Sequence, residues 1–229
     1  MNRKNKKYNH AVFFPMLALS ALLLYGCNGN SSNEARKLPI LGERDVVEHQ
    51  VNGKTVEDTA YLAIPPFAFV DQDSQVVTNK TFDNKVYVTD FFFTTCPSIC
   101  PKMKTQMLRV YDKFKTNPNV LLLSHTIDPE HDSVAVLKDF SERLGVKADK
   151  WHFVTGNKDS IYAIAEKYLV PVQQTKGANG GYIHGGHFML IDGNRHIRGV
   201  YDGTDPLEVD QLMTDIPVLL NEEQQHAKK

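Results

Sequence analysis

Cysteine is scarce in this 229-residue sequence, which has three, at positions 27, 96 and 100. Neither charge sign forms a long block outside the first few residues and the formal net charge is −1, so the charge pattern of a nucleic-acid-binding protein is missing. No internal repeat occurs, and the apolar run at residues 11–25 is shorter than the roughly 20 residues that span a membrane. What remains is room for one globular domain with flanking segments, whose partners should be proteins or small ions.

The amino terminus has the pattern of an export signal. Four basic residues within positions 3–7 precede the apolar run, which ends at Gly26-Cys27. A small residue directly before a cysteine resembles a bacterial lipobox, in which that cysteine becomes the lipidated first residue. We predict a lipoprotein signal peptide at residues 1–26 and lipidation of Cys27; an uncleaved anchor with an incidental cysteine is the alternative. The protein would be exported and held on a membrane, facing the periplasm or the cell exterior.

Residues 27–37 begin with a run of Asn, Ser and Gly that cannot bury enough apolar surface to fold, which predicts a flexible tether. In residues 38–62, short stretches of alternating apolar and polar residues lie around the turn-like Asn52-Gly53, which predicts a short β extension. Beyond it, strands are expected at 85–93, 120–127, 151–154, 188–191 and 197–201. Helices are expected directly after the strand at 85–93, at 133–144, at 159–168 and after Pro206. This order predicts an α/β domain at residues 63–222, followed by a tail at 223–229.

Cys96 and Cys100 follow the predicted strand at 85–93, whose continuous apolar character fits a central position in a sheet. A cysteine pair at the first strand-to-helix junction favours a thioredoxin-like fold, with another small α/β sandwich as the alternative. We expect both cysteines on one helix face, where the spacing of four residues lets two thiolates bind one metal ion or close a disulfide. Pro97 and Pro101 fit the opening turn of that helix, whose positive end would lower the thiol pKa values. A purely structural disulfide is the other possibility, but it would close only a short loop.

A third ligand would complete this site, because two thiolates and one imidazole suit copper in either oxidation state. His184 and His187 are the candidates, since they stand just before the predicted strand at 188–191. Thioredoxins normally have a proline near this point, facing the active-site cysteines, whereas this segment has none.

Residues 91–101, 126–132, 151–156, and 184 with 188–192 together resemble the Sco/SenC family of copper-binding proteins. The resemblance implies an exported, membrane-attached thioredoxin fold that helps to assemble the copper centre of cytochrome c oxidase. In that family two cysteines and one later histidine bind copper, and the histidine stands eight residues before the aspartate that closes the next strand. Counting back from Asp192 gives His184, so the implied ligands of Cu(I) or Cu(II) are Cys96, Cys100 and His184. His187 is then expected to be a strand-entry side chain.

Other residues near these motifs are expected to be structural or are left open. Asp128 could orient a ligand or could only form a local turn, and we leave it outside the predicted site. His125 is predicted to be a core or rim histidine with satisfied hydrogen bonds rather than a fourth ligand. Met103 and Met107 lie on the apolar stripe of the first helix.

Two classes of function remain. A copper chaperone would bind one ion and deliver it to the apo copper subunit of cytochrome c oxidase, whereas a thiol-disulfide oxidoreductase would reduce the copper-ligand cysteines of that target. His184 favours the chaperone, because an oxidoreductase has no use for it, so a carrier is favoured over an enzyme while reductase activity stays open. In an oxidising compartment Cys96 and Cys100 would also need a thiol reductant protein as a partner.

Overall fold

The structure is a computed structural model that describes residues 36–175 and 182–226. The predicted signal peptide, Cys27 and the tether up to residue 35 therefore lie outside the described residues. Arg36–Lys229 forms one compact unit. Within the described ranges, no helix is both long enough and apolar enough to cross a membrane.

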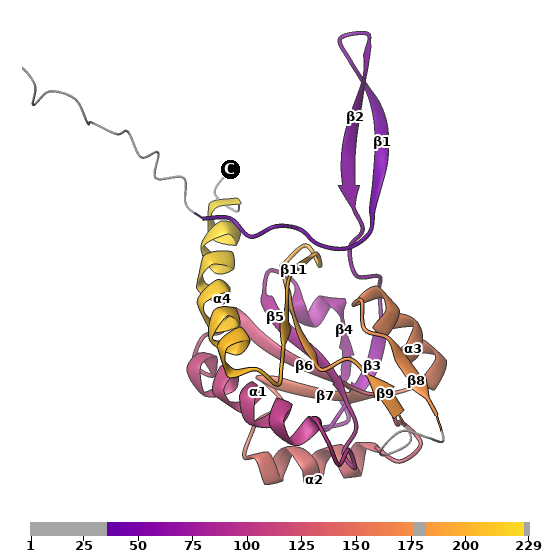
Figure 1. Cartoon of the computed structure of the whole chain (residues 1–229), viewed down its shortest axis with the longest axis vertical. Coiled ribbons are helices and arrows are strands. Elements are labelled where there is room, and N and C mark those ends of the chain that lie inside the picture. Colours follow the sequence, from indigo (N-terminus) through magenta and orange to yellow (C-terminus); the bar gives the residue numbers. More distant parts are fainter. Residues whose placement is uncertain (1–35, 176–181, 227–229) are drawn as a thin grey trace, which may run out of the picture. The chain divides into compact units, whose positions relative to one another are not determined.

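A seven-stranded sheet organises this unit (Figure 1). In spatial order its strands are β11 (Ile197–Asp202), β10 (His187–Ile191), β5 (Val86–Phe92), β6 (Val120–Thr126), β7 (Trp151–Thr155), β3 (Ala68–Asp71) and β4 (Val76–Thr78). The three central strands β5, β6 and β7 run parallel, and the outer strands pair antiparallel. The helices are η1 (Asn79–Phe82, a 3-10 helix), α1 (Cys100–Phe114), α2 (Val134–Leu144), α3 (Lys158–Lys167) and α4 (Pro206–His226).

Helices cover both faces of the sheet because its central strands are apolar on both faces. Every residue of β5 and of β6 is buried. The ring of Phe92 packs against Phe140 of α2, with centroids 5.5 Å apart, so α2 lies on the face to which Phe92 belongs. On the opposite face, Tyr87 meets Tyr168 at the end of α3 through their hydroxyl groups, 2.8 Å apart. The sequence predicted β5, β6, β7, β10, β11, α2 and α3 within one residue at each end.

The β extension is a separate two-stranded hairpin, β1 (Arg44–Val51) and β2 (Lys54–Tyr61). Asn52 and Gly53 both have positive φ angles, 53° and 76°, as a two-residue hairpin turn requires. Nearly every residue of the two strands is exposed. The prediction of a hairpin around Asn52-Gly53 is thus confirmed.

Two pairs of short strands were missed by the sequence reading. The hairpin of β3 and β4 forms one edge of the main sheet. β8 (Val172–Gln174) pairs with β9 (Tyr182–His184) in a separate small sheet. Residues 223–226 also differ from the expected tail, because α4 continues to His226. Just before this segment, Glu222 fastens α4 to the rest of the domain, because its carboxylate accepts hydrogen bonds from Arg198 at 2.6 Å and from the backbone of Leu38 at 2.7 Å.

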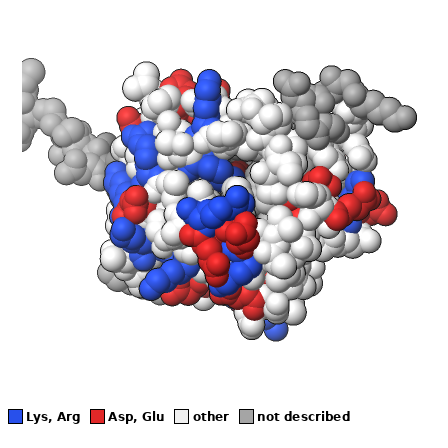
Figure 2. Space-filling view, turned by 90° about the horizontal axis from the view of Figure 1, so that it is seen from below, with Lys and Arg blue, Asp and Glu red and all other residues white. Residues whose placement is uncertain are grey.

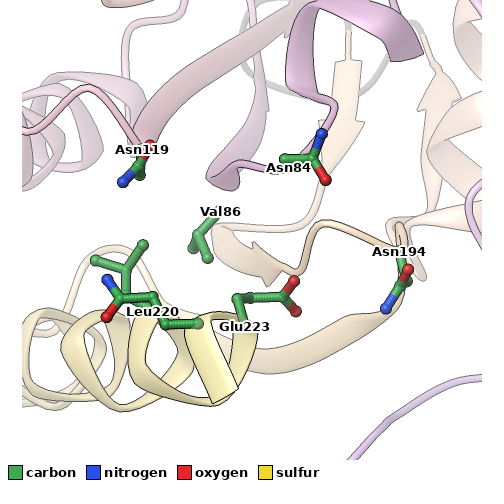
Figure 3. A pocket seen from close by; sticks show the side chains of 7 residues that line it. Asn84, Val86, Asn119, Asn194, Leu220 and Glu223 are labelled. Carbon is green, nitrogen blue, oxygen red and sulfur yellow. The ribbon is translucent and has the colours of Figure 1, made fainter. Parts of the chain in front are cut away.

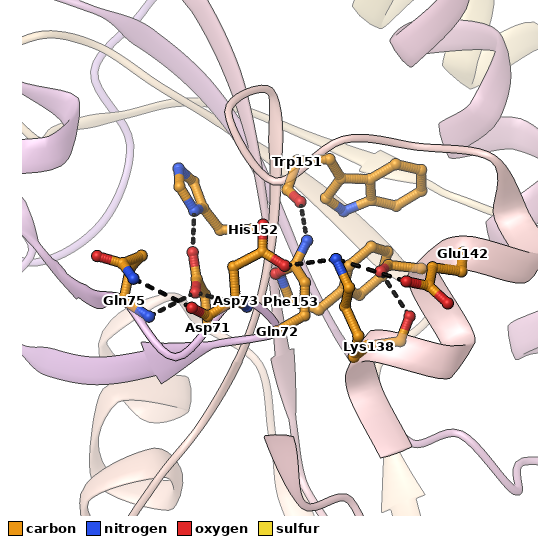
Figure 4. A network of polar contacts seen from close by, with 10 residues as sticks. Asp71, Gln72, Asp73, Gln75, Lys138, Glu142, Trp151, His152 and Phe153 are labelled. Atoms are coloured by element: carbon orange, nitrogen blue, oxygen red, sulfur yellow. Dashed lines mark hydrogen bonds and ion pairs between the residues drawn. The ribbon is translucent and has the colours of Figure 1, made fainter. Parts of the chain in front are cut away.

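Polar side chains fasten the β3–β4 hairpin to the sheet (Figure 4). The buried carboxylate of Asp71 lies 2.9 Å from Nδ1 of His152 and accepts the backbone N–H groups of Asp73 and Gln75, both at 2.9 Å. The side chain of Gln72 bonds the backbone of β7 on both sides of His152. His152 thus has a carboxylate partner in the hairpin, which the sequence did not indicate.

Charges of both signs are mixed on the surface. On the face seen in Figure 2, Lys and Arg side chains lie among Asp and Glu side chains, and uncharged residues cover much of the rest. Exposed ion pairs such as Lys138–Asp73 at 2.7 Å and Arg143–Asp139 at 3.0 Å contribute only about 0–1 kcal/mol each.

Candidate metal centre

The two cysteines lie at the carboxyl end of β5, at the centre of the sheet. Cys96 is in the loop after the strand, where its N–H donates to the carbonyl of Phe93 at 3.2 Å, and Cys100 is the first residue of α1. Their exposed fractions are 9% and 4%, so both thiols are buried. The expectation that both cysteines share a helix face is wrong, because α1 begins only at Cys100, with Pro101 in its first turn and Pro97 in the loop.

The thiol of Cys100 is held in its protonated form. A hydrogen bond with the thiol of Cys96 raises the pKa of Cys100, burial raises it further, and the positive charge of Lys104 acts in the opposite direction. We expected the helix terminus to lower the thiol pKa values, and for Cys100 this is wrong because the neighbouring sulfur and burial dominate. A metal ion bound here must displace the proton of Cys100.

A buried ion pair lies one helical turn after Cys100. Nζ of Lys104 is 2.8 Å from the carboxylate of Asp90 and 3.3 Å from Oγ of Ser124, and it lies 4.1 Å from the ring centroid of Phe92. Asp90 and Lys104 are 0% and 5% exposed. The pair ties α1 to the middle of β5 and so fixes the helix that begins at Cys100.

His184, the third expected ligand, is the last residue of β9, where its backbone pairs with Val172. Its side chain lies outside the part of the structure that is described, so its role as a ligand stays a prediction. The next residues are placed clearly: a Cβ atom on Gly186 would lie 3.4 Å from Cδ1 of Ile99, and the carbonyl of Gly186 accepts the N–H of Gly203 at 2.7 Å. The chain just after His184 therefore packs on the residue before Cys100.

His187 opens β10 at an exposed position opposite Asp202. Hydrogen bonds from the hydroxyl and the N–H of Thr204 lower the pKa of Asp202. This placement agrees with the prediction of a strand-entry side chain. No group of three or more Cys, His, Asp and Glu side chains able to hold a metal occurs among the side chains that the structure describes.

The loop at residues 128–132, which we call the acidic loop, lies beside the loop at residues 93–99, which contains Cys96 and which we call the cysteine loop. The buried carboxylate of Asp132 accepts the N–H of Thr94 at 3.0 Å and the hydroxyl of Thr94 as well, two residues before Cys96. The carboxylate of Asp128 accepts the hydroxyl of Tyr182 at 2.8 Å. Sequence reasoning missed Asp132, Thr94 and Tyr182, although the position of Tyr182, two residues before His184 on one strand, could have signalled it.

His125 is a core residue, as predicted, but its hydrogen bonds are not satisfied. It is 0% exposed, and neither ring nitrogen has a hydrogen-bond partner. Its ring stacks on Phe91, with centroids 4.8 Å apart, and meets the edge of Phe69 at 5.3 Å. Burial lowers the pKa of His125 to about 3, so the imidazole is neutral in the folded protein.

A pocket of about 300 Å³ lies at the other end of the parallel strands (Figure 3). Asn84, Asn119 and Asn194 surround Val86, the first residue of β5, and Glu223 of α4 lies beside them. Because the cysteines follow the last residue of β5, this pocket is separate from the candidate metal centre.

Comparison with known proteins places the chain in a family. The SCO1/SenC family model matches residues 56–221. A SCO1/SenC family lipoprotein from Bacillus anthracis is 28% identical with a TM-score of 0.63, covering 69% of this chain and 94% of that one. BsSco, a member of the Sco family of cytochrome c oxidase assembly proteins, is 29% identical with a TM-score of 0.61, covering 69% and 93%.

ScoI from Arabidopsis thaliana, whose structure was solved with copper bound, is 25% identical with a TM-score of 0.57, covering 72% of this chain and 99% of that one. These likenesses confirm the thioredoxin-like fold expected from the order of strands and helices. The family match covers more than half of the chain, including both cysteines and His184. The chain therefore belongs to the SCO1/SenC family.

Proposed function

We propose that this protein binds one copper ion through Cys96, Cys100 and His184 and delivers it to the copper centre of cytochrome c oxidase. The observation that carries the proposal is the pair of buried thiols at the end of β5, with the chain that follows His184 packed against Ile99. Two thiolates and an imidazole form a donor set that suits copper. A relative with copper bound and a relative described as an oxidase assembly protein support the cargo and its destination.

A thiol-disulfide oxidoreductase is the second candidate. The hydrogen bond between the thiols of Cys96 and Cys100 favours it, because sulfur atoms in contact can also form a disulfide. In that role the dithiol would reduce the copper-ligand cysteines of the oxidase subunit. One experiment distinguishes the two candidate functions: the reduced protein either takes up one copper ion per chain or reduces a protein disulfide. His184 is needed only for copper uptake.

Replacing His184 with Ala should weaken Cu(I) binding about 100-fold and remove the thiolate charge-transfer band of the Cu(II) form. Structural zinc sites of four such ligands are worth roughly 10–16 kcal/mol, so the loss of one ligand costs about 3 kcal/mol. Affinity is measured by competition with a Cu(I) chelator. His187→Ala is the matched control and should bind as the wild type does, while equal losses in both variants would refute the assignment of His184.

We further propose that Cys27 carries a lipid that anchors the protein to a membrane. The proposed partners at this membrane are the oxidase subunit and a thiol reductant protein. The proposal rests on Gly26-Cys27 after the short apolar run, and the Bacillus anthracis relative is a lipoprotein. Cys27→Ser should move the protein from the membrane fraction to the soluble fraction and abolish labelling by a fatty-acid analogue. Membrane retention of this variant, with no lipid on the wild type, would indicate an uncleaved anchor instead.

A further inference from the structure

Strand β9 needs a tie to the rest of the protein, because it is not part of the main sheet. Among the described strands it pairs only with β8, and each of the two has three residues. An isolated pair of short strands is marginally stable in water. The position of the backbone at His184 therefore depends on the contacts that hold β9.

Tyr182 supplies such a contact. It is 8% exposed, and its ring packs on Phe93, with centroids 5.1 Å apart. Its hydroxyl donates to the carboxylate of Asp128 at 2.8 Å. Tyr182 and His184 are two residues apart on β9 and so occupy positions on the same face of that strand.

The acidic loop joins this contact to the cysteine loop. Asp128 and Asp132 are linked within the loop, since the N–H of Asp132 donates to the carbonyl of Asp128 at 2.8 Å. Asp132 in turn accepts the N–H of Thr94, two residues before Cys96. A continuous series of hydrogen bonds thus runs from β9 through Tyr182, Asp128 and Asp132 to the loop of Cys96.

From this series we infer that Tyr182 is a positioning residue of the metal centre: its hydrogen bond to Asp128 holds the strand of His184 at a fixed place relative to the cysteine loop. The inference deepens the proposed function and rests on it in so far as His184 binds the metal. The sequence left open whether Asp128 orients a ligand or only forms a local turn. In this inference Asp128 accepts the hydrogen bond of Tyr182 and so helps to hold β9. Groups that orient metal ligands typically change metal affinity by 10–100-fold when removed.

The test uses Tyr182→Phe, which keeps the ring on Phe93 and removes only the hydroxyl. Cu(I) affinity of the full-length reduced protein should fall about tenfold. In the copper-free protein, amide exchange at residues 172–174 and 182–184 should become about fivefold faster, the effect of losing one hydrogen bond. Tyr162→Phe is the matched control, because Tyr162 donates to the carbonyl of Ile127 at 3.2 Å, beside Asp128, and does not belong to β9.

Asp128→Ala should reproduce both effects, and the double variant Tyr182→Phe/Asp128→Ala should lose no more than either single variant. Wild-type affinity in Tyr182→Phe, or an equal loss in Tyr162→Phe, would overturn the inference. A wild-type protein that binds no copper would contradict the proposed function instead, and the exchange rates would then decide whether Tyr182 holds β9. Unchanged exchange at residues 182–184 would show that it does not.

Discussion

Closing a disulfide between Cys96 and Cys100 should abolish copper binding. The disulfide removes two of the three proposed ligands at once and leaves only the imidazole of His184. At about 3 kcal/mol per ligand, the loss of both thiolates costs about 6 kcal/mol, which is roughly a 10⁴-fold fall in affinity. Both thiols are buried and hydrogen-bonded to each other. The same two sulfur atoms can therefore either bind copper or form the disulfide, but not both.

The measurement is a copper titration of the chain from residue 31 onward, in its fully reduced and fully oxidised forms. One ion per chain is expected for the dithiol and none for the disulfide. Cys96→Ser/Cys100→Ser serves as the control that cannot be oxidised, and it should resemble the disulfide form under reducing conditions as well. If the oxidised protein binds one copper ion as tightly as the reduced protein, the three-ligand site is wrong.

Acid should destabilise the protein steeply because of His125. Its pKa is about 3 in the folded protein and about 6.5 in the unfolded chain, so only the unfolded state binds the proton between these values. The free energy of unfolding therefore falls as the pH falls below about 6.5, at about 1.4 kcal/mol per pH unit from this group. The loss reaches about 2 kcal/mol at pH 5 and about 4 kcal/mol near pH 3. Tyr168, the ionisable group beside the ring, offers no counter-charge, because its own pKa is raised far above this range.

His125→Phe isolates this contribution, since other carboxylates and histidines titrate equally in both proteins. The variant should be at least as stable as the wild type at pH 7, because it removes two buried nitrogens without hydrogen bonds, each of which costs about 1–3 kcal/mol. Urea unfolding of both proteins from pH 7 to pH 4 measures the difference. Stability curves that stay parallel over this range would show that His125 is not the group that binds the proton.

Elements with a pattern of their own were predictable from the sequence. β5 and β6 are continuous apolar runs, and α2 begins at a Ser133 cap and ends at Gly145, which has a φ of 69°. In contrast, β3, β4, β8 and β9 have three or four residues each, and such strands exist only because a partner strand pairs with them.

The cysteine site shows the same limit. The two cysteines and the strand before them were readable from the chain, but the start of α1 was not, because Pro97 and Pro101 both fit an opening turn. The raised pKa of Cys100 depends on the thiol of Cys96 and on burial, which a linear spacing does not contain. Tyr182 and Asp128 are far apart in the chain, so their hydrogen bond was also invisible in the sequence.

The strand order of the main sheet has a consequence for how fast the protein folds. β3 pairs with β7, where Val70 lies opposite Thr155, and β5 pairs with β10, where Tyr87 lies opposite Ile191. Such pairings join distant segments, and loop-closure entropy must be overcome before they contribute any stability, so they raise the contact order and slow folding. The platform under Cys96 and Cys100 cannot be completed before residue 191 is available. If the chain is exported, as proposed, both thiols are exposed to oxidants until that residue joins the sheet, so a reductant is needed before folding is complete.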